Sequence, residues 1–213
     1  MYKKKPFFIV FEGVEGCGKS YQSQKLYNNL KKLKIKSILT REPGGTDNAE
    51  VIRNLILKDY FLKNKKKAFH RYTDTFLYLA ARNEHVQDKI IPALKSKMVV
   101  ICDRFIDSTY AYQVHGKKVN KVLIDKIHNV IIGKYKPNLT IVLKVTTRSS
   151  RQRIKKRRLK NRYDKFSDSF YKSVQKSFLR RAKGKKNYVI FESSKNTPKL
   201  EKDILNLVLK RLR

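Results

Sequence analysis

The stretch GVEGCGKS at residues 13–20 follows the apolar run FFIVF (7–11) and precedes an amphipathic run that begins at Ser20. It matches the pattern G-x-x-x-x-G-K-[ST] in full, between a predicted strand and a predicted helix, as this phosphate-binding loop requires. Its glycines allow backbone N–H groups to converge on phosphate oxygens, and the helix adds the positive end of its dipole. We therefore predict a nucleoside-triphosphate site. Its predicted members are Gly13, Val14, Glu15, Gly16, Cys17, Gly18, Lys19 and Ser20.

Two residues at the end of another strand extend this chemistry. The run VVICDRF (99–105) is apolar until it reaches Asp103 and Arg104. An aspartate in that place can hold Mg²⁺ together with the Ser20 hydroxyl, while Arg104 offers a bidentate fork to an anion. Lys19 is expected to reach the β- and γ-phosphates. The sequence thus predicts catalytic roles for Lys19 and Arg104, and a magnesium site at Ser20 and Asp103.

Glu15 is an unusual member of a phosphate-binding loop. Its carboxylate would be repelled by the phosphates unless the side chain points elsewhere. We therefore infer that a second ligand lies beside the triphosphate.

Apolar runs alternate with segments of helical period along the whole chain. The predicted strands are 7–11, 36–40, 98–103, 139–145 and 187–193. Helical spacing is found at 122–132, where Val122, Ile124, Ile127, Val130 and Ile131 roughly share a face, and at 200–212. Alternating strands and helices predict an α/β fold, with a parallel five-stranded sheet covered by helices on both faces. Because no linker divides the chain, we expect a single domain over residues 1–213.

Composition narrows the classes of function. The net charge is +35, from 52 Lys+Arg against 17 Asp+Glu, yet no nucleic-acid-binding motif accompanies it. No apolar run is long enough to span a membrane, and the two cysteines give neither a disulfide framework nor a metal spacing. We expect a cytoplasmic protein with no membrane partner and no specific nucleic-acid partner. The four histidines lack metal spacing and are expected to be structural.

The sequence also predicts a surface for a nucleotide base, in the segment between the predicted strands 36–40 and 98–103. The run FLYLAARNEHV (76–86) places Tyr78 and Arg82 one helical turn apart, so that a ring can stack on a base while a guanidinium hydrogen-bonds it. The segment TREPGGT (40–46) leaves the second strand through a proline and two glycines.

Together, FEGVEGCGKS, TREPGGT, LAARNEHV, CDRFIDSTYAYQ and the basic segment RQRIKKRRLKNRYDKF (151–166) resemble the thymidylate kinases, and the bacterial type in particular. The resemblance extends from Phe7 to the C-terminal helix. It implies a P-loop nucleotide-kinase fold with a basic lid at about residues 148–166. It also implies Mg²⁺-dependent transfer of the γ-phosphoryl group of ATP to dTMP, by a chain that forms a homodimer.

The resemblance assigns further residues by position. It implies the dTMP phosphate near Arg53 and Arg104, thymine stacked on Tyr78, and Arg82 at the exocyclic oxygen of the base. Glu15 matches the family's loop carboxylate, which meets the 3′-hydroxyl of the deoxyribose. The same matching places four residues around the base and sugar: Ser108, Thr109, Tyr112 and Gln113.

The lid is expected to supply the catalytic cation. In one type of the family an arginine follows the loop carboxylate, but Gly16 holds that place here. Arg153, Lys155, Arg157 and Arg162 match the basic lid, with Arg158 as an added cation. We predict Arg157, and after it Arg153, as the catalytic arginine.

Some features leave alternatives open. Glu84, Lys144 and the loop 115–120 depart from the family pattern. A deoxynucleoside kinase would share the loop and lid but would need a carboxylate base, for which Glu42 stands in a plausible place. A basic P-loop ATPase that binds nucleic acid is a further alternative.

Overall fold

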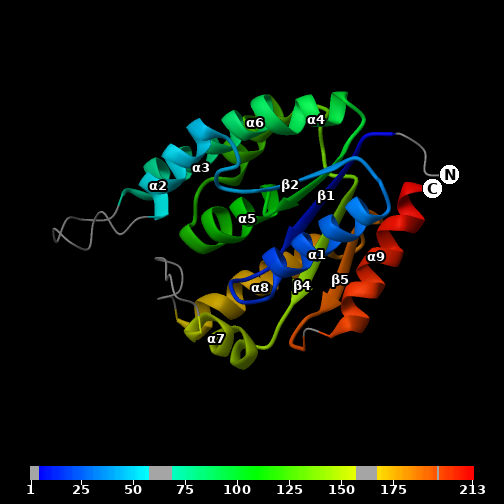
Figure 1. Ribbon diagram of the computed structural model, residues 1–213. Helices are drawn as coiled ribbons and strands as arrows, with labels where there is room; N and C mark the ends of the chain where they lie inside the picture. Colours follow the sequence, from blue (N-terminus) through cyan, green and yellow to red (C-terminus); the bar gives the residue numbers. More distant parts are fainter. Residues whose placement is uncertain (1–4, 58–68, 157–166, 196) are drawn as a thin grey trace.

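The computed structural model describes residues 5–57, 69–156, 167–195 and 197–213 (Figure 1). All strands run parallel in one sheet, in the order β2-β3-β1-β4-β5. The strands are β1 (Phe7–Glu12), β2 (Ser37–Arg41), β3 (Val99–Asp103), β4 (Leu139–Lys144) and β5 (Tyr188–Glu192). The five predicted strands and the predicted α/β architecture are therefore confirmed.

Helices cover both faces of this sheet. The α-helices are α1 (Lys19–Lys32), α2 (Asp47–Leu57), α3 (Arg71–His85), α4 (Ile91–Lys95), α5 (Ile106–Thr109), α6 (Lys121–Ile132), α7 (Thr147–Lys155), α8 (Asp168–Ala182) and α9 (Pro198–Leu212). Two π-helical segments, η1 (Val86–Ile90) and η2 (Tyr110–Gly116), continue α3 and α5. Figure 1 shows α3, α4 and α6 over one face and α1, α8 and α9 over the other.

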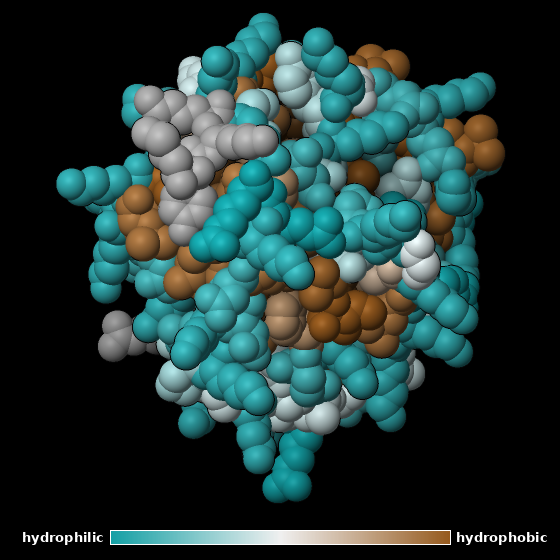
Figure 2. All heavy atoms as spheres, turned by 90° about the vertical axis from the view of Figure 1, so that its right-hand side faces the viewer, coloured by the Kyte–Doolittle hydropathy of each residue, from teal (hydrophilic) through white to brown (hydrophobic). Residues whose placement is uncertain are grey.

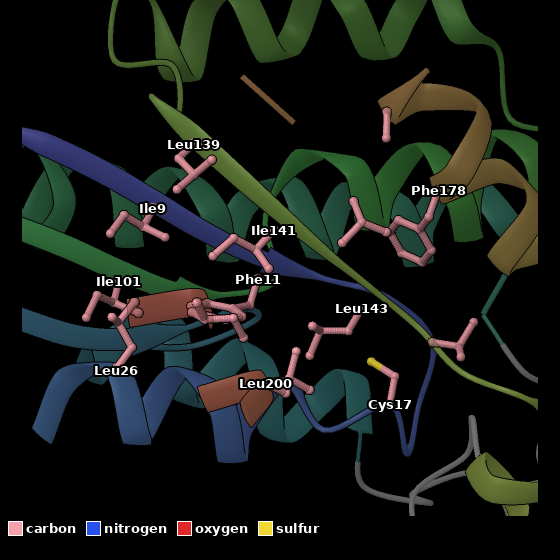
Figure 3. Packing of buried hydrophobic residues seen from close by; sticks show 14 of the residues in the cluster. Ile9, Phe11, Cys17, Leu26, Ile101, Leu139, Ile141, Leu143, Phe178 and Leu200 are labelled. Carbon is pink, nitrogen blue, oxygen red and sulfur yellow. The ribbon is translucent and has the colours of Figure 1, made fainter. Parts of the chain in front are cut away.

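Each strand divides its side chains between two cores. On β1, Phe7, Ile9 and Phe11 pack with α1, α8 and α9 (Figure 3), whereas Phe8 and Val10 pack on the opposite face with α3 and α6. Successive strand residues point to opposite faces, so a strand covered on both sides must be apolar throughout. Burying each such side chain stabilises the fold by about 1.5–3 kcal/mol. This is why the central strands are continuous apolar runs.

Polar residues mark the beginnings of the helices. The side chains of Asn120, Thr146, Ser167 and Thr197 each accept a hydrogen bond from a backbone N–H in the first turn of α6, α7, α8 and α9. Such caps satisfy donors that have no partner inside the helix. They explain why the chain turns into a helix at these points.

The predicted face of α6 is wrong in part. Ile124 and Ile131 are buried, but Val122 is 60% exposed and Val130 is 85% exposed. The two valines lie away from the core, because one helix face cannot include positions this far apart in angle.

Much of the surface is hydrophilic, as the charge predicts. Figure 2 views the molecule from the right-hand side of Figure 1, where α9 ends, and shows mostly hydrophilic side chains around a central apolar patch. Within the described ranges, no helix is both long and apolar enough to cross a membrane.

The sheet determines where the site can form. The phosphate loop follows β1, the segment TREPGG ends β2, and Asp103 ends β3, with Phe11 and Arg41 both paired to Asp103 in the register. Parallel strands bring all these ends to one edge of the sheet, which is where ligands bind in open α/β folds.

Candidate active site

The phosphate loop lies between β1 and α1 and fits closely against its neighbours. Gly13 and Gly16 have φ angles of +141° and +71°. A Cβ at Gly13 would lie 2.6 Å from the Leu143 carbonyl oxygen, and one at Gly16 would lie 2.6 Å from that of Ser150. Only glycine fits these places without displacing β4 or α7. An arginine could not replace Gly16 here without moving α7.

Lys19 begins α1 and folds back over the loop. Its side chain is buried, and Nζ donates to the carbonyl oxygens of Gly13 (3.0 Å) and Val14 (2.8 Å). The ammonium is therefore held at the centre of the loop. Cys17 is fully buried among apolar side chains (Figure 3), so it fills space under the loop.

Ser20 and Asp103 meet across the edge of the sheet. Ser20 Oγ donates to Asp103 Oδ2 at 2.5 Å, and Asp103 Oδ1 is buried with no hydrogen-bond partner in the described part of the chain. A carboxylate oxygen and a hydroxyl are ligands of the kind that Mg²⁺ prefers. The two predicted metal ligands thus lie together, and one carboxylate oxygen of Asp103 has no partner among the described residues.

Glu15 points away from the centre of the loop. Its Oε1 accepts from Arg104 Nη2 at 2.8 Å and its Oε2 accepts from the Tyr112 hydroxyl at 2.5 Å. Burial, and after it the charge of Glu15, raises the pKa of Tyr112, so the hydroxyl stays protonated. Although burial opposes it, Tyr112 and Glu15 raise the pKa of Arg104. The carboxylate therefore links the loop to the segment after β3.

One pocket brings the predicted residues together. From the phosphate side it is lined by Glu15, Lys19, Ser20, Asp103 and Arg104. Beyond these, its wall contains all the other residues predicted to bind dTMP: Arg53, Tyr78, Arg82, Ser108, Thr109, Tyr112 and Gln113. Sequence reasoning did not assign Arg41, Pro43 and Leu57, which also line it. Arg41 and Pro43 both lie in the TREPGGT motif, which was the only signal for them.

Arg82 is less available to a ligand than its sequence position suggests. Nε donates to Glu42 Oε2 at 2.8 Å, and Nη2 lies 2.6 Å from the same oxygen and 3.0 Å from the Phe105 carbonyl oxygen. Nη1 contacts Thr109 Oγ1 at 2.7 Å and His128 Nε2 at 2.8 Å. All of its N–H groups therefore face protein partners. A base could receive a hydrogen bond from Arg82 only if one of these contacts opened.

Glu42 is the acidic partner in this buried group. Oε2 binds Arg82, and Oε1 lies 3.1 Å from Nδ1 of the buried His85. Although burial opposes it, Arg82 and His85 lower the pKa of Glu42, which therefore stays ionised. A general base needs a free oxygen aimed at the proton it removes. Both Glu42 oxygens are already engaged by side chains of α3.

Arg53 and Arg153 reach the site from two helices. Arg53 on α2 donates to the Pro43 carbonyl oxygen and lines the pocket. Arg153 on α7 donates to the Gly16 carbonyl oxygen at 3.1 Å, and to those of Ser193 and Ser194, both at 2.8 Å. Of the predicted lid cations, Arg157, Arg158 and Arg162 lie outside the described residues.

Two residues that depart from the family pattern, Glu84 and Lys144, are not among those that line this pocket. The half-buried Glu84 accepts from Asn48 Nδ2 at 2.9 Å, and the exposed Lys144 Nζ lies 3.9 Å from Glu192. In the described ranges, no group of three or more His, Cys, Asp or Glu side chains could hold a metal ion. His70 caps α3, and His85 and His128 are buried and hydrogen-bonded.

Comparison with known proteins gives consistent matches. A sequence model of the family described as thymidylate kinase matches residues 11–204. The thymidylate kinase of Aster yellows witches'-broom phytoplasma (strain AYWB) is 43% identical over 174 residues, 81% of each chain. That of Wolbachia pipientis subsp. Culex pipiens (strain wPip) is 37% identical over 209 residues, 96% of each chain. The crystal structure of thymidylate kinase from Ehrlichia chaffeensis superposes with a TM-score of 0.73 at 30% identity, covering 98% of this chain and 100% of that one.

Proposed function

The chain belongs to the thymidylate kinase family, as its motifs predicted, and from this premise we propose which of its residues carry phosphoryl transfer from ATP to dTMP. Membership makes it an ATP-dependent nucleoside monophosphate kinase that forms dTDP. The observation that supports our assignment is the pocket shared by Lys19, Ser20 and Asp103 and by every residue assigned to dTMP. A kinase of this type must hold two nucleotides end to end, and one pocket with both sets of residues suits that need.

We assign the triphosphate of ATP to the loop Gly13–Ser20, including Val14, Glu15, Gly16, Cys17 and Gly18. Lys19 moves from the Gly13 and Val14 carbonyl oxygens to the β- and γ-phosphates, because an ammonium gains more from phosphate than from neutral carbonyls. Mg²⁺ would be held by Ser20 and Asp103, where it supplies charge neutralisation between donor and acceptor phosphates. The acceptor phosphate is itself a nucleophile, so the site needs no general base.

We assign dTMP to the opposite wall. Arg53 and Arg104 neutralise its phosphate, and Tyr78 stacks on thymine. Gln113 Nε2 is buried without a partner in the described residues, which leaves a donor for the base or the sugar. Arg82 orients Thr109 and can give one N–H to the base when it releases a partner. Glu15 and Tyr112 border the deoxyribose, with Ser108 beside the base.

The catalytic cations of the lid are proposed to be Arg157 and Arg153. Arg153 already bonds the Gly16 carbonyl oxygen, so the described part of the lid touches the phosphate loop directly. Transfer builds negative charge between the two nucleotides, and an arginine in that region lowers the barrier. Lys19 and Arg104 complete the set of positive groups.

We also propose that the kinase works as a homodimer of single-domain chains in the cytoplasm. The helix α3 packs against both α2 and α6 (Figure 1), and five of the exposed large apolar residues of the described ranges belong to these three helices. They are Val51 (70%), Leu55 (40%), Phe76 (46%), Val122 (60%) and Val130 (85%). An exposed apolar surface over several elements is typical of an interface. Both cysteines are free thiols, which suits a reducing compartment.

Ligand-induced stabilisation and turnover test the function together. We expect dTMP to raise the melting temperature more than thymidine, dUMP, GMP or CMP, because binding to the native state stabilises it. With ATP and Mg²⁺, dTMP should be phosphorylated and thymidine should not. The preference for dTMP over dUMP should be about 1–3 kcal/mol, the range for one methyl group in an apolar pocket. Faster turnover with thymidine than with dTMP would contradict the assignment.

A further inference from the structure

Glu12 is a buried carboxylate that the proposed chemistry does not use. It is the last residue of β1, directly before Gly13, and its side chain is fully buried. Oε1 accepts from the backbone N–H groups of Phe105 (2.8 Å) and Ser108 (3.1 Å), and Oε2 accepts from Ser108 Oγ (2.7 Å). All three donors belong to the segment that follows β3. Glu12 therefore joins the phosphate loop's own strand to that segment.

Arg104, the residue before Phe105, is fixed by hydrogen bonds of both its backbone and its side chain. Its φ angle of +72° is unfavourable for a residue with a side chain, and its N–H donates to the Phe11 carbonyl oxygen at 2.9 Å. Nη1 donates to the Gly13 carbonyl oxygen (3.0 Å) and to Ser108 Oγ (3.2 Å), and Nη2 donates to Glu15. A strained backbone persists only where its surroundings fix it. Glu12 fixes the next residue, Phe105, and also the hydroxyl that Arg104 contacts.

We propose that Glu12 is a positioning residue for phosphoryl transfer, which orients Arg104 against the phosphate loop through Phe105 and Ser108. The inference rests on the proposed role of Arg104 at the dTMP phosphate. It assigns Glu12 no contact with either nucleotide.

The direction of one hydrogen bond makes the positioning depend on the charge of Glu12. While Glu12 is a carboxylate, the Ser108 hydroxyl gives its proton to Oε2 and keeps its lone pairs for Arg104 Nη1. A protonated Glu12 would instead donate to Ser108 Oγ, so that the hydroxyl no longer donates to an anion and becomes a weaker acceptor for Arg104 Nη1. Arg104 is then held less firmly. A glutamine at position 12 would impose the same donor pattern at every pH.

The surroundings of Glu12 bring its protonation close to neutral pH. Burial, and after it the nearby Asp107 on α5, raises the pKa of Glu12 to about 7, while Arg104 opposes the shift. Asp107 itself is paired with Arg181 of α8 and accepts from the Tyr188 hydroxyl of β5. We therefore expect the positioning to weaken as the pH falls through about 7.

The test compares Glu12→Gln, Arg104→Ala and the double variant by steady-state kinetics between pH 6 and pH 8.5. At pH 8.5, Glu12→Gln should lower kcat/KM for dTMP by about tenfold, the effect of weakening one hydrogen bond to a charged group, with little change in KM for ATP. The ratio of parent to Glu12→Gln should approach one near pH 6. Titration of the dTMP phosphate occurs in both proteins and cancels in this ratio. Glu201→Gln is the matched control, because Glu201 also accepts from a hydroxyl, that of Tyr21, but lies outside the pocket.

The coupling between the substitutions at Glu12 and Arg104 distinguishes a positioning role of Glu12 from a merely structural one. If Glu12 acts through Arg104, the double variant should be no slower than Arg104→Ala alone. The inference would be overturned if the losses of the two single variants multiplied in the double variant, or if the ratio of parent to Glu12→Gln activity stayed constant with pH. A rise of both KM values, for ATP and for dTMP, in Glu12→Gln would also overturn it. Parent-level activity of Arg104→Ala would show that the proposed role of Arg104 is wrong, and the inference with it. If Glu12→Gln does not fold, Ser108→Ala breaks the same link and is judged by the same coupling to Arg104→Ala.

Discussion

Lys19 illustrates how a residue can be essential for the reaction without being needed for the fold. Its ammonium donates to the carbonyl oxygens of Gly13 and Val14 in the loop. We expect Lys19→Ala to abolish detectable phosphoryl transfer while the melting temperature stays close to the parent value, because the side chain serves phosphate charge. Coupled-enzyme assays and circular dichroism on the same preparation check this. Near-normal turnover would mean that the loop does not bind the donor phosphates in the way we propose.

Glu15 gives a prediction about two ligands at once. Its carboxylate binds Arg104 and Tyr112 on the dTMP side of the pocket, although it belongs to the loop that holds ATP. Glu15→Gln should therefore raise KM for dTMP more than KM for ATP. Both Michaelis constants can be measured at saturating levels of the other substrate. An equal rise in the two would contradict the placement of Glu15 between the substrates.

His128 should make the fold sensitive to acid. Burial, and after it the charge of Arg82, lowers the pKa of His128 from 6.5 to about 2. Below about pH 6.5 the unfolded chain therefore binds a proton that the native state excludes, so the free energy of unfolding falls as the pH falls, by about 1.4 kcal/mol per pH unit. Relative to His128→Gln, the parent should lose stability as the pH drops from 7 to 5. The opposite effect of Glu12, whose pKa is raised, is present in both proteins and cancels in the difference.

Urea unfolding of the two proteins at each pH measures that difference. A difference that does not change with pH would show that His128 titrates normally in the folded protein.

Between elements, the contact of α7 with the phosphate loop is the feature with most consequence for catalysis. Arg153 bonds the carbonyl oxygen of Gly16, and the close approach of Ser150 leaves no room for a side chain there. An arginine therefore has no room at position 16 of the loop, and we propose that the lid supplies the arginine that assists Lys19. This is a structural reason for the glycine at the position where another type of the family has an arginine.

The lid prediction follows from that arrangement. Replacing the critical arginine, Arg157 or Arg153, by alanine should lower kcat by about 10³-fold with little change in KM, because its contact strengthens in the transition state. Arg153→Ala should in addition lower the melting temperature, since it also bonds the Ser193 and Ser194 carbonyl oxygens. Kinetics of Arg153→Ala, Arg157→Ala, Arg158→Ala and the triple variant check this. A triple variant within about tenfold of the parent, some 1.4 kcal/mol, would place the catalytic cation elsewhere.

The strands and the phosphate loop were easier to predict from the sequence than the hydrogen bonds between side chains of different elements. The strands could be located because a strand buried on both faces must be apolar throughout, and the phosphate loop because its pattern is contiguous. The partners of Arg82 could not be found in this way, since they come from the end of β2, the segment after β3, and α6. Glu12 gave no signal either, because its three donors lie about ninety residues away.

Over the whole molecule, charge and apolar surface act against each other. The net charge of +35 on each chain opposes association of two copies, while the exposed side chains of α2, α3 and α6 favour it. Salt screens the repulsion, with a Debye length of about 8 Å at physiological ionic strength, but hardly affects apolar contact. The two contributions can therefore be separated by varying the salt concentration.

We expect the parent to sediment as a dimer whose dissociation constant falls as salt rises from about 0.05 M to 0.5 M, because the repulsion between like charges is screened over that range. Val122→Lys and Val130→Lys on α6 should shift the mass toward that of a single chain, since each would bury an unpaired ammonium in the interface. Ile190→Lys is the matched control: Ile190 is 44% exposed but lies on β5, apart from the three helices. The stability of a chain changed at such exposed positions should stay within about 0.5 kcal/mol of the parent, so a change in mass would report on association and not on folding. A parent that sediments as a single chain at every salt concentration, or an equal effect of Ile190→Lys, would contradict an interface built on α2, α3 and α6.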